Sequence, residues 1–237
     1  MSVSFHALIV AAGKAQRFGG ALPKQYVPLM GKPVLAYSID ALRQVPGLRG
    51  ITVVLATDDA DFEVLIGSRH GRIATTEGGE TRAESVLKGL DAIRQADPET
   101  SWVMVHDGAR PCIEAEQVIE LTRVANDHED GAILAIPVSD TLKRADQCGL
   151  IRSDVDRDGL WAAQTPQLFQ ADRLAGALRH MLNSERQPTD EASAMQLAGA
   201  RPRLVRGSSH NIKITWPADV ALAEAVLAAR RNPESRI

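Results

Sequence analysis

The amino-acid sequence predicts an α/β fold with a doubly wound, mostly parallel sheet, and two observations support this prediction. Apolar runs rich in β-branched residues, such as Ile51–Ala56, are typical of strands that are covered on both faces. These runs alternate with segments of helical periodicity, which is typical of parallel strands joined by right-handed crossovers. The 237 residues contain no repeat and no linker-like stretch, so we expect a single domain over residues 1–237.

The individual elements follow from local signals. Pro33 suits the first position of a helix, where no N–H donor is needed, and Leu35–Leu42 continues with helical spacing. The acids of Asp58–Asp61 lie where negative charge favours a helix start. The expected strands cover residues 7–10, 51–56, 72–76, 102–106, 132–137 and 211–214. The expected helices begin at Pro33 or cover residues 59–66, 83–96, 114–125, 171–182, 190–198 and 218–229, and residues 230–237 are expected to fray.

The segment Ser139–Leu160 interrupts this alternation and is called the arm below. It is rich in charged residues, and short β-prone pieces flank a hairpin-like turn at Gln147–Gly149. We expect a projecting β-arm at about residues 139–160, and an exposed flexible loop is the alternative. Arms of this kind often pack against a partner subunit.

Composition excludes several classes of protein. The formal net charge of −3 argues against a dedicated nucleic-acid binder. The chain has neither an apolar run of membrane-spanning length nor the features of a signal peptide, so we expect a cytoplasmic protein without membrane contacts. Two cysteines and six scattered histidines form no disulfide framework and no zinc-binding pattern.

A glycine-rich, cationic loop follows the first expected strand, at Ala11–Lys24. Glycines let backbone N–H groups approach phosphate closely, and cations neutralise phosphate charge. Four cations precede the first acidic residue of the chain, Asp40: Lys14, Arg17, Lys24 and Lys32. This pattern predicts a triphosphate cradle, with a solvated basic loop as the alternative. The spacing matches neither the common phosphate-loop motif nor the dinucleotide-binding fingerprint.

Three further positions have side chains or backbone suited to nucleotide chemistry. Asp107 follows an expected strand and is suited to hold Mg²⁺, although an aspartate capping a turn is equally common. Gly78–Ser85 can shape a pocket for a base, or merely start a helix capped by Thr81. Lys213 lies on an expected strand, where a buried lysine needs an anionic partner such as a second phosphate. A solvated basic face is the alternative.

No nucleophile triad is evident in the sequence. A phosphate monoester has a second pKa of about 6 and is largely dianionic at pH 7, so it needs no general base to act as a nucleophile. Catalysis would then consist of positioning and charge neutralisation.

Several motifs, taken in their order along the chain, resemble those of the 2-C-methyl-D-erythritol 4-phosphate cytidylyltransferase family. The specific ones are Val105–Pro111 and Gln164–Gln167. The others are Ala11–Lys24, Gly78–Ser85, Asp140-Thr141, Arg157 with Trp161–Ala163, Thr189–Glu191 and Asn211–Lys213. Two positions depart from the family pattern: Ala15 replaces a usual glycine, and Ser139 replaces a residue that is often basic.

The resemblance implies a Rossmann-like nucleotidyltransferase fold and transfer of a cytidylyl group from CTP to 2-C-methyl-D-erythritol 4-phosphate, in non-mevalonate isoprenoid synthesis. It assigns transition-state stabilisation to Arg17 and Lys24, and Mg²⁺ binding to Asp107. It assigns nucleotide binding to Ala11, Ala12, Gly13, Gly79, Glu80 and Ser85. It assigns binding of the acceptor to Thr141, Arg157, Thr165, Thr189, Lys213 and Arg110.

Two alternatives to this function stay open. One is a cytidylyltransferase for another polyol phosphate, such as ribitol 5-phosphate. The other is a non-catalytic nucleotide-sensing module, which would not require Arg17, Lys24 and Asp107 together. Because Thr141 and Arg157 lie in the polar arm, we expect a C2 homodimer in which the arm serves the neighbouring subunit.

Overall fold

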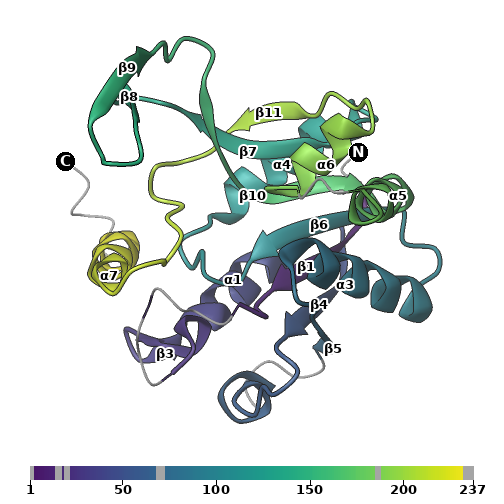
Figure 1. The fold of residues 1–237 in the computed structure, drawn as a ribbon. Helices are drawn as coiled ribbons and strands as arrows, with labels where there is room; N and C mark the ends of the chain where they lie inside the picture. Colours follow the sequence, from purple (N-terminus) through teal and green to yellow (C-terminus); the bar gives the residue numbers. More distant parts are fainter. Residues whose placement is uncertain (1–2, 14–17, 19–21, 68–72, 185–187, 232–237) are drawn as a thin grey trace.

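The computed structural model describes residues 3–13, 18, 22–67, 73–184 and 188–231. Within them, seven strands form one sheet in the order β11-β7-β10-β6-β1-β4-β5 (Figure 1). β10 is antiparallel to both of its neighbours and the other pairs are parallel, so the prediction of a mostly parallel sheet is confirmed. The strands are β1 Phe5–Val10, β4 Leu48–Leu55, β5 Ala74–Glu77, β6 Trp102–Asp107, β7 Ala132–Pro137, β10 Trp161–Gln170 and β11 Arg203–Arg206.

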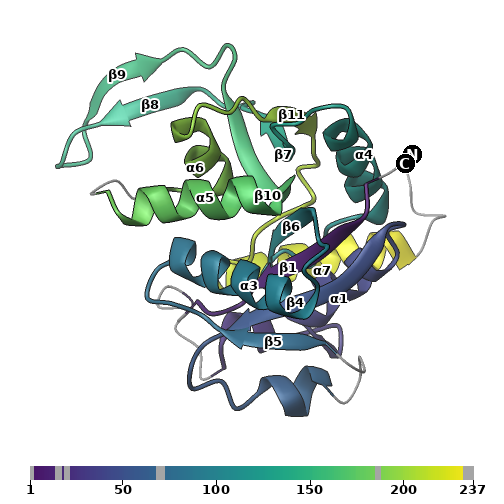
Figure 2. The same cartoon turned by 90° about the vertical axis from the view of Figure 1, so that its right-hand side faces the viewer.

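Helices cover both faces of this sheet, as a doubly wound fold requires (Figure 2). Successive residues of a strand point to opposite faces, so Leu8 and Ile9 of β1 enter different clusters of the core. Ile9 packs with α1 Val34–Arg43 and α4 Ala115–Asn126. Leu8 packs with the helices of the other face, α3 Arg82–Ala96, α5 Ala171–Leu182 and α6 Glu191–Leu197.

A smaller layer lies beside the main core. The hairpin of β2 Pro28–Leu29 and β3 Lys32–Pro33 packs against α7 Ala218–Arg231 through Leu29 and Leu227. One turn of 3₁₀ helix, η1 Lys24–Tyr26, precedes this hairpin. No helix of the described residues is both long and apolar enough to cross a membrane.

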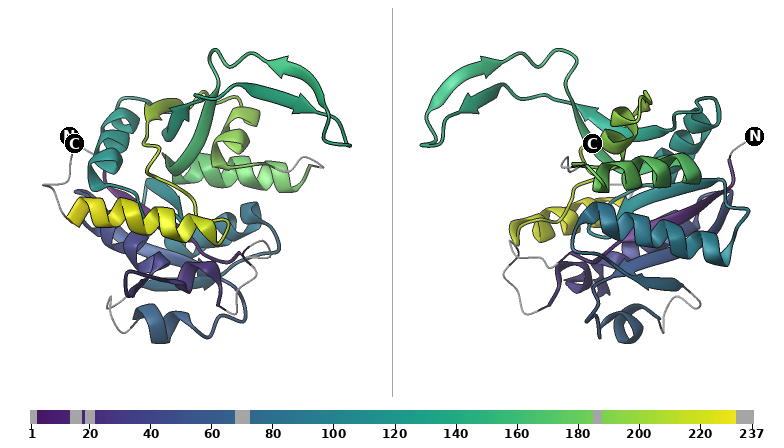
Figure 3. Two further views of the ribbon diagram at one scale, coloured as in Figure 1. Left: turned by 90° about the vertical axis from the view of Figure 1, so that its left-hand side faces the viewer. Right: turned by 45° about the vertical axis from the view of Figure 1, so that its right-hand side comes forward.

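The arm contains an antiparallel hairpin, β8 Leu142–Ala145 and β9 Ile151–Val155, as expected. It projects from the body of the molecule (Figure 3). Almost all of its side chains are exposed, so the arm is held together by its own backbone ladder rather than by the core.

Two expected elements are wrong, and two strands were not expected. Residues 211–214 form no strand. The Ile214 N–H donates to the Ala109 carbonyl, and the Ile214 carbonyl accepts from the Lys24 side chain, so neither group joins a ladder of strand hydrogen bonds. The strand at this edge of the sheet is β11, and neither β11 nor β10 was expected. In place of a helix over residues 59–66 there is a short π-helical turn, η2 Glu63–Gly67. The strand expected at residues 72–76 is β5 in its described part, and the expectation for residues 232–237 lies outside the described residues.

Candidate active site

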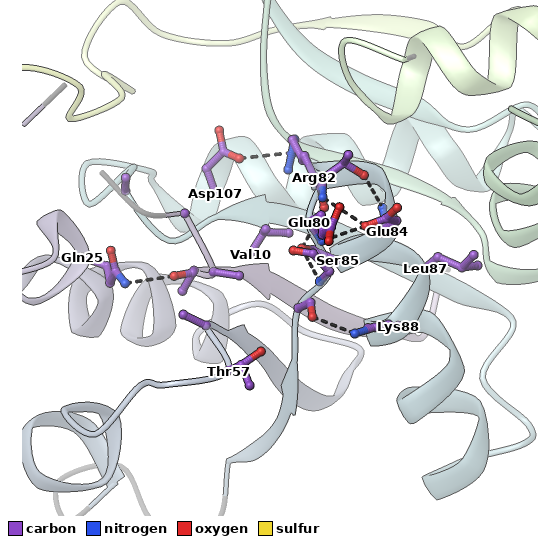
Figure 4. A pocket seen from close by; sticks show the side chains of 18 of the residues that line it. Val10, Gln25, Thr57, Glu80, Arg82, Glu84, Ser85, Leu87, Lys88 and Asp107 are labelled. Atoms are coloured by element: carbon purple, nitrogen blue, oxygen red, sulfur yellow. Dashed lines mark hydrogen bonds and ion pairs between the residues drawn. The ribbon is translucent and has the colours of Figure 1, made fainter. Parts of the chain in front are cut away.

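A cavity of about 1180 Å³ opens at the carboxyl edge of the sheet, beyond β1, β4, β5 and β6 (Figure 4). Ligands of open α/β sheets bind at this edge, and the volume suits a nucleotide with a second substrate. Nine of the predicted site residues line it: Ala11, Ala12, Gly13, Lys24, Gly79, Glu80, Ser85, Asp107 and Lys213. The loops after separate strands therefore meet as the sequence predicted.

The glycine turn forms one wall of the cavity. A Cβ on Gly78 would lie 2.6 Å from the Cβ of Ala12, and one on Gly79 would lie 2.4 Å from the Cβ of Glu84, so both positions require glycine. The Gly79 N–H donates to Ser85 Oγ over 3.0 Å. The Thr81 hydroxyl and Glu84 form a capping box at the start of α3. This segment therefore starts a helix and also lines the cavity, while its binding of a base stays a prediction.

Two side chains that follow the loop after β1 contact the described part of the site. Buried Gln25, which sequence reasoning missed, donates to the Ala11 carbonyl over 2.9 Å. The Lys24 ammonium lines the cavity and donates to the Ile214 carbonyl over 3.0 Å. Lys32 is not part of this cationic wall, because its ammonium pairs with Asp40 and lies over the ring of Tyr37. The predicted Arg17, with Lys14 and Ala15, lies outside the described residues.

Asp107 ends β6 and is surrounded by three cations, which together with it form the Asp107 cluster. Its Oδ1 lies 3.1 Å from Arg82 Nη2, while its Oδ2 lies 2.9 Å from Lys213 Nζ and 3.4 Å from Arg110 Nε. Burial by itself would raise the pKa of this carboxyl, but Arg82, Lys213 and Arg110 together hold that pKa well below its usual range. Asp107 is therefore an ionised carboxylate at neutral pH.

The backbone of Asp107 is held by residues of β10 and of the segment before α7. The Asp107 N–H donates to Thr165 Oγ1 over 3.0 Å, and the same hydroxyl bonds to His106 Nδ1 at 3.1 Å. Asn211, fully buried, donates to the Thr165 carbonyl and accepts from Arg110 Nη1 over 2.7 Å. Two predicted acceptor ligands, Thr165 and Arg110, thus lie behind Asp107 and do not line the cavity.

A second acid bonds to the same nitrogen of Arg82 as Asp107 does. Glu191, 1% exposed, accepts from Arg82 Nη2 over 2.9 Å. Burial raises the pKa of Glu191, and the nearby Arg82 opposes that rise. The predicted Thr189 is exposed, and its N–H donates to Ser193. The Thr189–Glu191 motif therefore contacts the Asp107 cluster through Glu191. In the sequence, this glutamate does not differ from an ordinary acid at the start of a helix.

The remaining predicted residues lie on the arm. Thr141 and Arg157 are both exposed, and neither lines the cavity. A hydrogen bond joins Arg157 Nη1 to the Ser139 carbonyl, at the base of the arm. The described part of one chain therefore leaves these two residues apart from the Asp107 cluster.

The donor set fits a metal that takes most of its ligands from elsewhere. No group of three or more histidine, cysteine or acidic side chains suited to a metal occurs among the described residues. Asp107 presents one ionised carboxylate to the cavity. Mg²⁺ commonly binds through one or two carboxylates, with waters and substrate phosphates completing its shell. The site thus suits Mg²⁺ arriving with a triphosphate.

Comparisons with known proteins agree with this geometry. A family model described as 2-C-methyl-D-erythritol 4-phosphate cytidylyltransferase (IspD) matches residues 5–229. Proteins of that name from Shewanella oneidensis and Dechloromonas aromatica are 45% and 44% identical to this chain, covering 96% and 95% of it and 90% and 98% of their own length. A crystal structure of 4-diphosphocytidyl-2C-methyl-D-erythritol synthase superposes with a TM-score of 0.82 at 36% identity, covering 96% of this chain and all of that one. The chain belongs to the 2-C-methyl-D-erythritol 4-phosphate cytidylyltransferase family and is a nucleotidyltransferase.

Proposed function

We propose that the cavity transfers a cytidylyl group from CTP to 2-C-methyl-D-erythritol 4-phosphate, in the cytoplasm and as a step of isoprenoid precursor synthesis. The products are 4-diphosphocytidyl-2-C-methyl-D-erythritol and pyrophosphate. The observation that carries this proposal is the convergence of the glycine turn, Lys24 and Asp107 on one cavity, in a chain of the cytidylyltransferase family.

The reaction is a substitution at the α-phosphorus of CTP. A phosphate oxygen of the acceptor forms the new P–O bond, and the bond from the α-phosphorus to the bridging oxygen breaks, so that the electron pair leaves with pyrophosphate. The acceptor phosphate is largely dianionic at pH 7, which explains why no general base is needed. The chain has to bring two anions together and neutralise the charge that develops between them.

We assign this work to the predicted site residues as follows. Lys24, with Arg17, stabilises negative charge at the α-phosphate. Gly79, Glu80 and Ser85 bind the cytosine, while Ala11, Ala12 and Gly13 bind the rest of the nucleotide. Mg²⁺, when bound, supplies positive charge to the triphosphate, and Asp107 is its ligand from the protein. Thr165 holds the backbone of Asp107, and Arg110 contacts its carboxylate.

The acceptor needs the arm as well as the cavity. Lys213 lies at the cavity, whereas Thr141 and Arg157 lie on the exposed arm. We assign these residues, with Thr189, to the acceptor. A homodimer with twofold symmetry places the arm of one subunit at the cavity of the other, and the exposed apolar side chains of Leu150 and Ile151 on the arm support such a contact.

Pyrophosphate release tests the proposal. Purified protein should release pyrophosphate with CTP, Mg²⁺ and 2-C-methyl-D-erythritol 4-phosphate, and UTP or excess chelator should abolish most of the rate. Faster turnover of ribitol 5-phosphate would assign the chain to another polyol phosphate. Tight CTP binding without product from any acceptor would favour a nucleotide sensor.

A further inference from the structure

Three cations share one carboxylate in the Asp107 cluster, and they are not equally anchored. Arg82 Nη2, which contacts Asp107, is also held by buried Glu191 over 2.9 Å, and Arg110 is held by the Asn211 carbonyl over 2.7 Å. Lys213 makes no second hydrogen bond or ion pair to another described residue through its side chain, and that side chain is 40% exposed. Lys213 is therefore the cation that leaves Asp107 most easily.

Lys213 is the nearest cation to one oxygen of Asp107, Oδ2, which it shares with the more distant Arg110. Its Nζ lies 2.9 Å from Asp107 Oδ2, while Arg82 bonds to the other oxygen, Oδ1. A lysine ammonium and a divalent cation that share one carboxylate oxygen repel each other and compete for the same lone pairs. Both Asp107 and Lys213 line the cavity, so a metal that arrives with the triphosphate meets this pair directly.

We propose that Lys213 and the divalent cation are alternative partners of Asp107 Oδ2, so that metal-bound nucleotide releases the Lys213 ammonium to the acceptor phosphate. This inference rests on the proposed function of Asp107 as a metal ligand. It makes Lys213 a positioning residue that couples the binding of the two substrates. Once released from Asp107, the ammonium is stabilised by another anion, and the acceptor phosphate is that anion.

The coupling has a counterintuitive consequence. Removing the Lys213 ammonium removes the competitor for Asp107, so the metal should strengthen CTP binding more in the variant than in the wild-type protein. The quantity to compare is the ratio of two dissociation constants, that of CTP in chelator and that of CTP with Mn²⁺. Loss of one competing ion pair should raise this ratio about tenfold in Lys213→Met.

Lys88 offers a matched control. It lines the same cavity, but its ammonium donates to the Gly78 carbonyl over 2.8 Å and does not touch Asp107. Lys88→Met removes the same charge from the same cavity, so any general electrostatic effect on metal binding appears in both variants. The competition predicts that the ratio changes less than about threefold in Lys88→Met.

Calorimetric titration of the full chain with CTP, with and without Mn²⁺, measures these ratios without turnover. Lys213→Gln, which keeps a polar side chain, gives the same comparison if Lys213→Met fails to fold. A ratio in the Lys213 variants equal to that of the wild type, or an equal rise in Lys88→Met, would overturn the competition and leave the metal role intact. A ratio near one in every protein would instead overturn the metal role of Asp107, and the competition with it.

Discussion

The cavity and the arm hold their polar residues in opposite ways. In the cavity, Asp107 contacts three cations and is 6% exposed, and its neighbours Arg82 and Arg110 are anchored to Glu191 and Asn211. On the arm, the ion pair of Lys143 with Asp154 is open to solvent on both sides. The polar residues of the cavity are thus preorganised by buried partners, while the arm presents Thr141 and Arg157 to solvent.

The largest effect should come from breaking the buried ion pair. Glu191→Ala leaves the Arg82 guanidinium without its nearer anion in a buried site, and the free energy of unfolding should fall by about 3 to 5 kcal/mol. Chemical denaturation of the two proteins measures this loss. A change below about 1 kcal/mol would show that the pair behaves like a surface pair.

Lys24→Ala should lower kcat far more than it raises the KM for CTP. One preorganised charge contact to the transition state weighs roughly 3 to 4 kcal/mol, or a 100- to 1,000-fold loss in kcat. Lys32→Ala is the matched control, because that nearby ammonium pairs with Asp40 and does not line the cavity. Steady-state kinetics decide between the roles, and normal kcat with weakened CTP binding would assign Lys24 to ground-state binding.

Acid should destabilise the body of the fold through His6. Burial lowers the pKa of this histidine from 6.5 to about 4, so the unfolded chain binds its proton first as the pH falls. Stability linked to His6 is therefore complete above pH 6.5 and is lost towards pH 4. Between pH 7 and pH 5 the wild type should lose about 2 kcal/mol more than His6→Gln, measured by denaturant unfolding. Equal losses in both proteins would contradict the shift.

The smallest effect belongs to the arm. Asp154→Ala removes an ion pair whose carboxylate side chain is 71% exposed. Solvent screens such pairs, so the unfolding free energy should change by less than about 1 kcal/mol. The same denaturation experiment that measures Glu191→Ala measures this change. A loss as large as that of Glu191→Ala would remove the contrast between cavity and arm.

The sequence predicts most of the sheet because its central strands are continuous apolar runs, as in β1 and β4. It fails at β10, because Gln164 and Pro166 are residues typical of loops. The strand accommodates them through a register shift between Ala163 and Gln167. It also fails at β11, an edge strand in which Val205 is the buried residue. In both places tertiary pairing overrides the local pattern.

The cavity wall was predictable for a similar reason. Loops after parallel strands meet at one edge, so Gly79, Lys24 and Asp107 converge without any knowledge of contacts. The supporting residues were not predictable. Glu191 and Gln25 act through burial and through partners that lie 109 and 14 residues away in the chain, and neither property has a signature in local spacing.

We propose above that a complete site combines the cavity of one chain with the arm of another, and subunit mixing tests this arrangement most directly. Lys24→Ala and Arg157→Ala proteins, each almost inactive, are unfolded together and refolded as a mixture. If the arm serves its neighbour, each heterodimer contains one intact site, and random pairing restores about a quarter of wild-type activity. Lys24→Ala mixed with the Lys24→Ala/Arg157→Ala double variant is the control, since no arrangement gives an intact site. Heterodimers that are verified by mass and stay as inactive as either parent would contradict the claim.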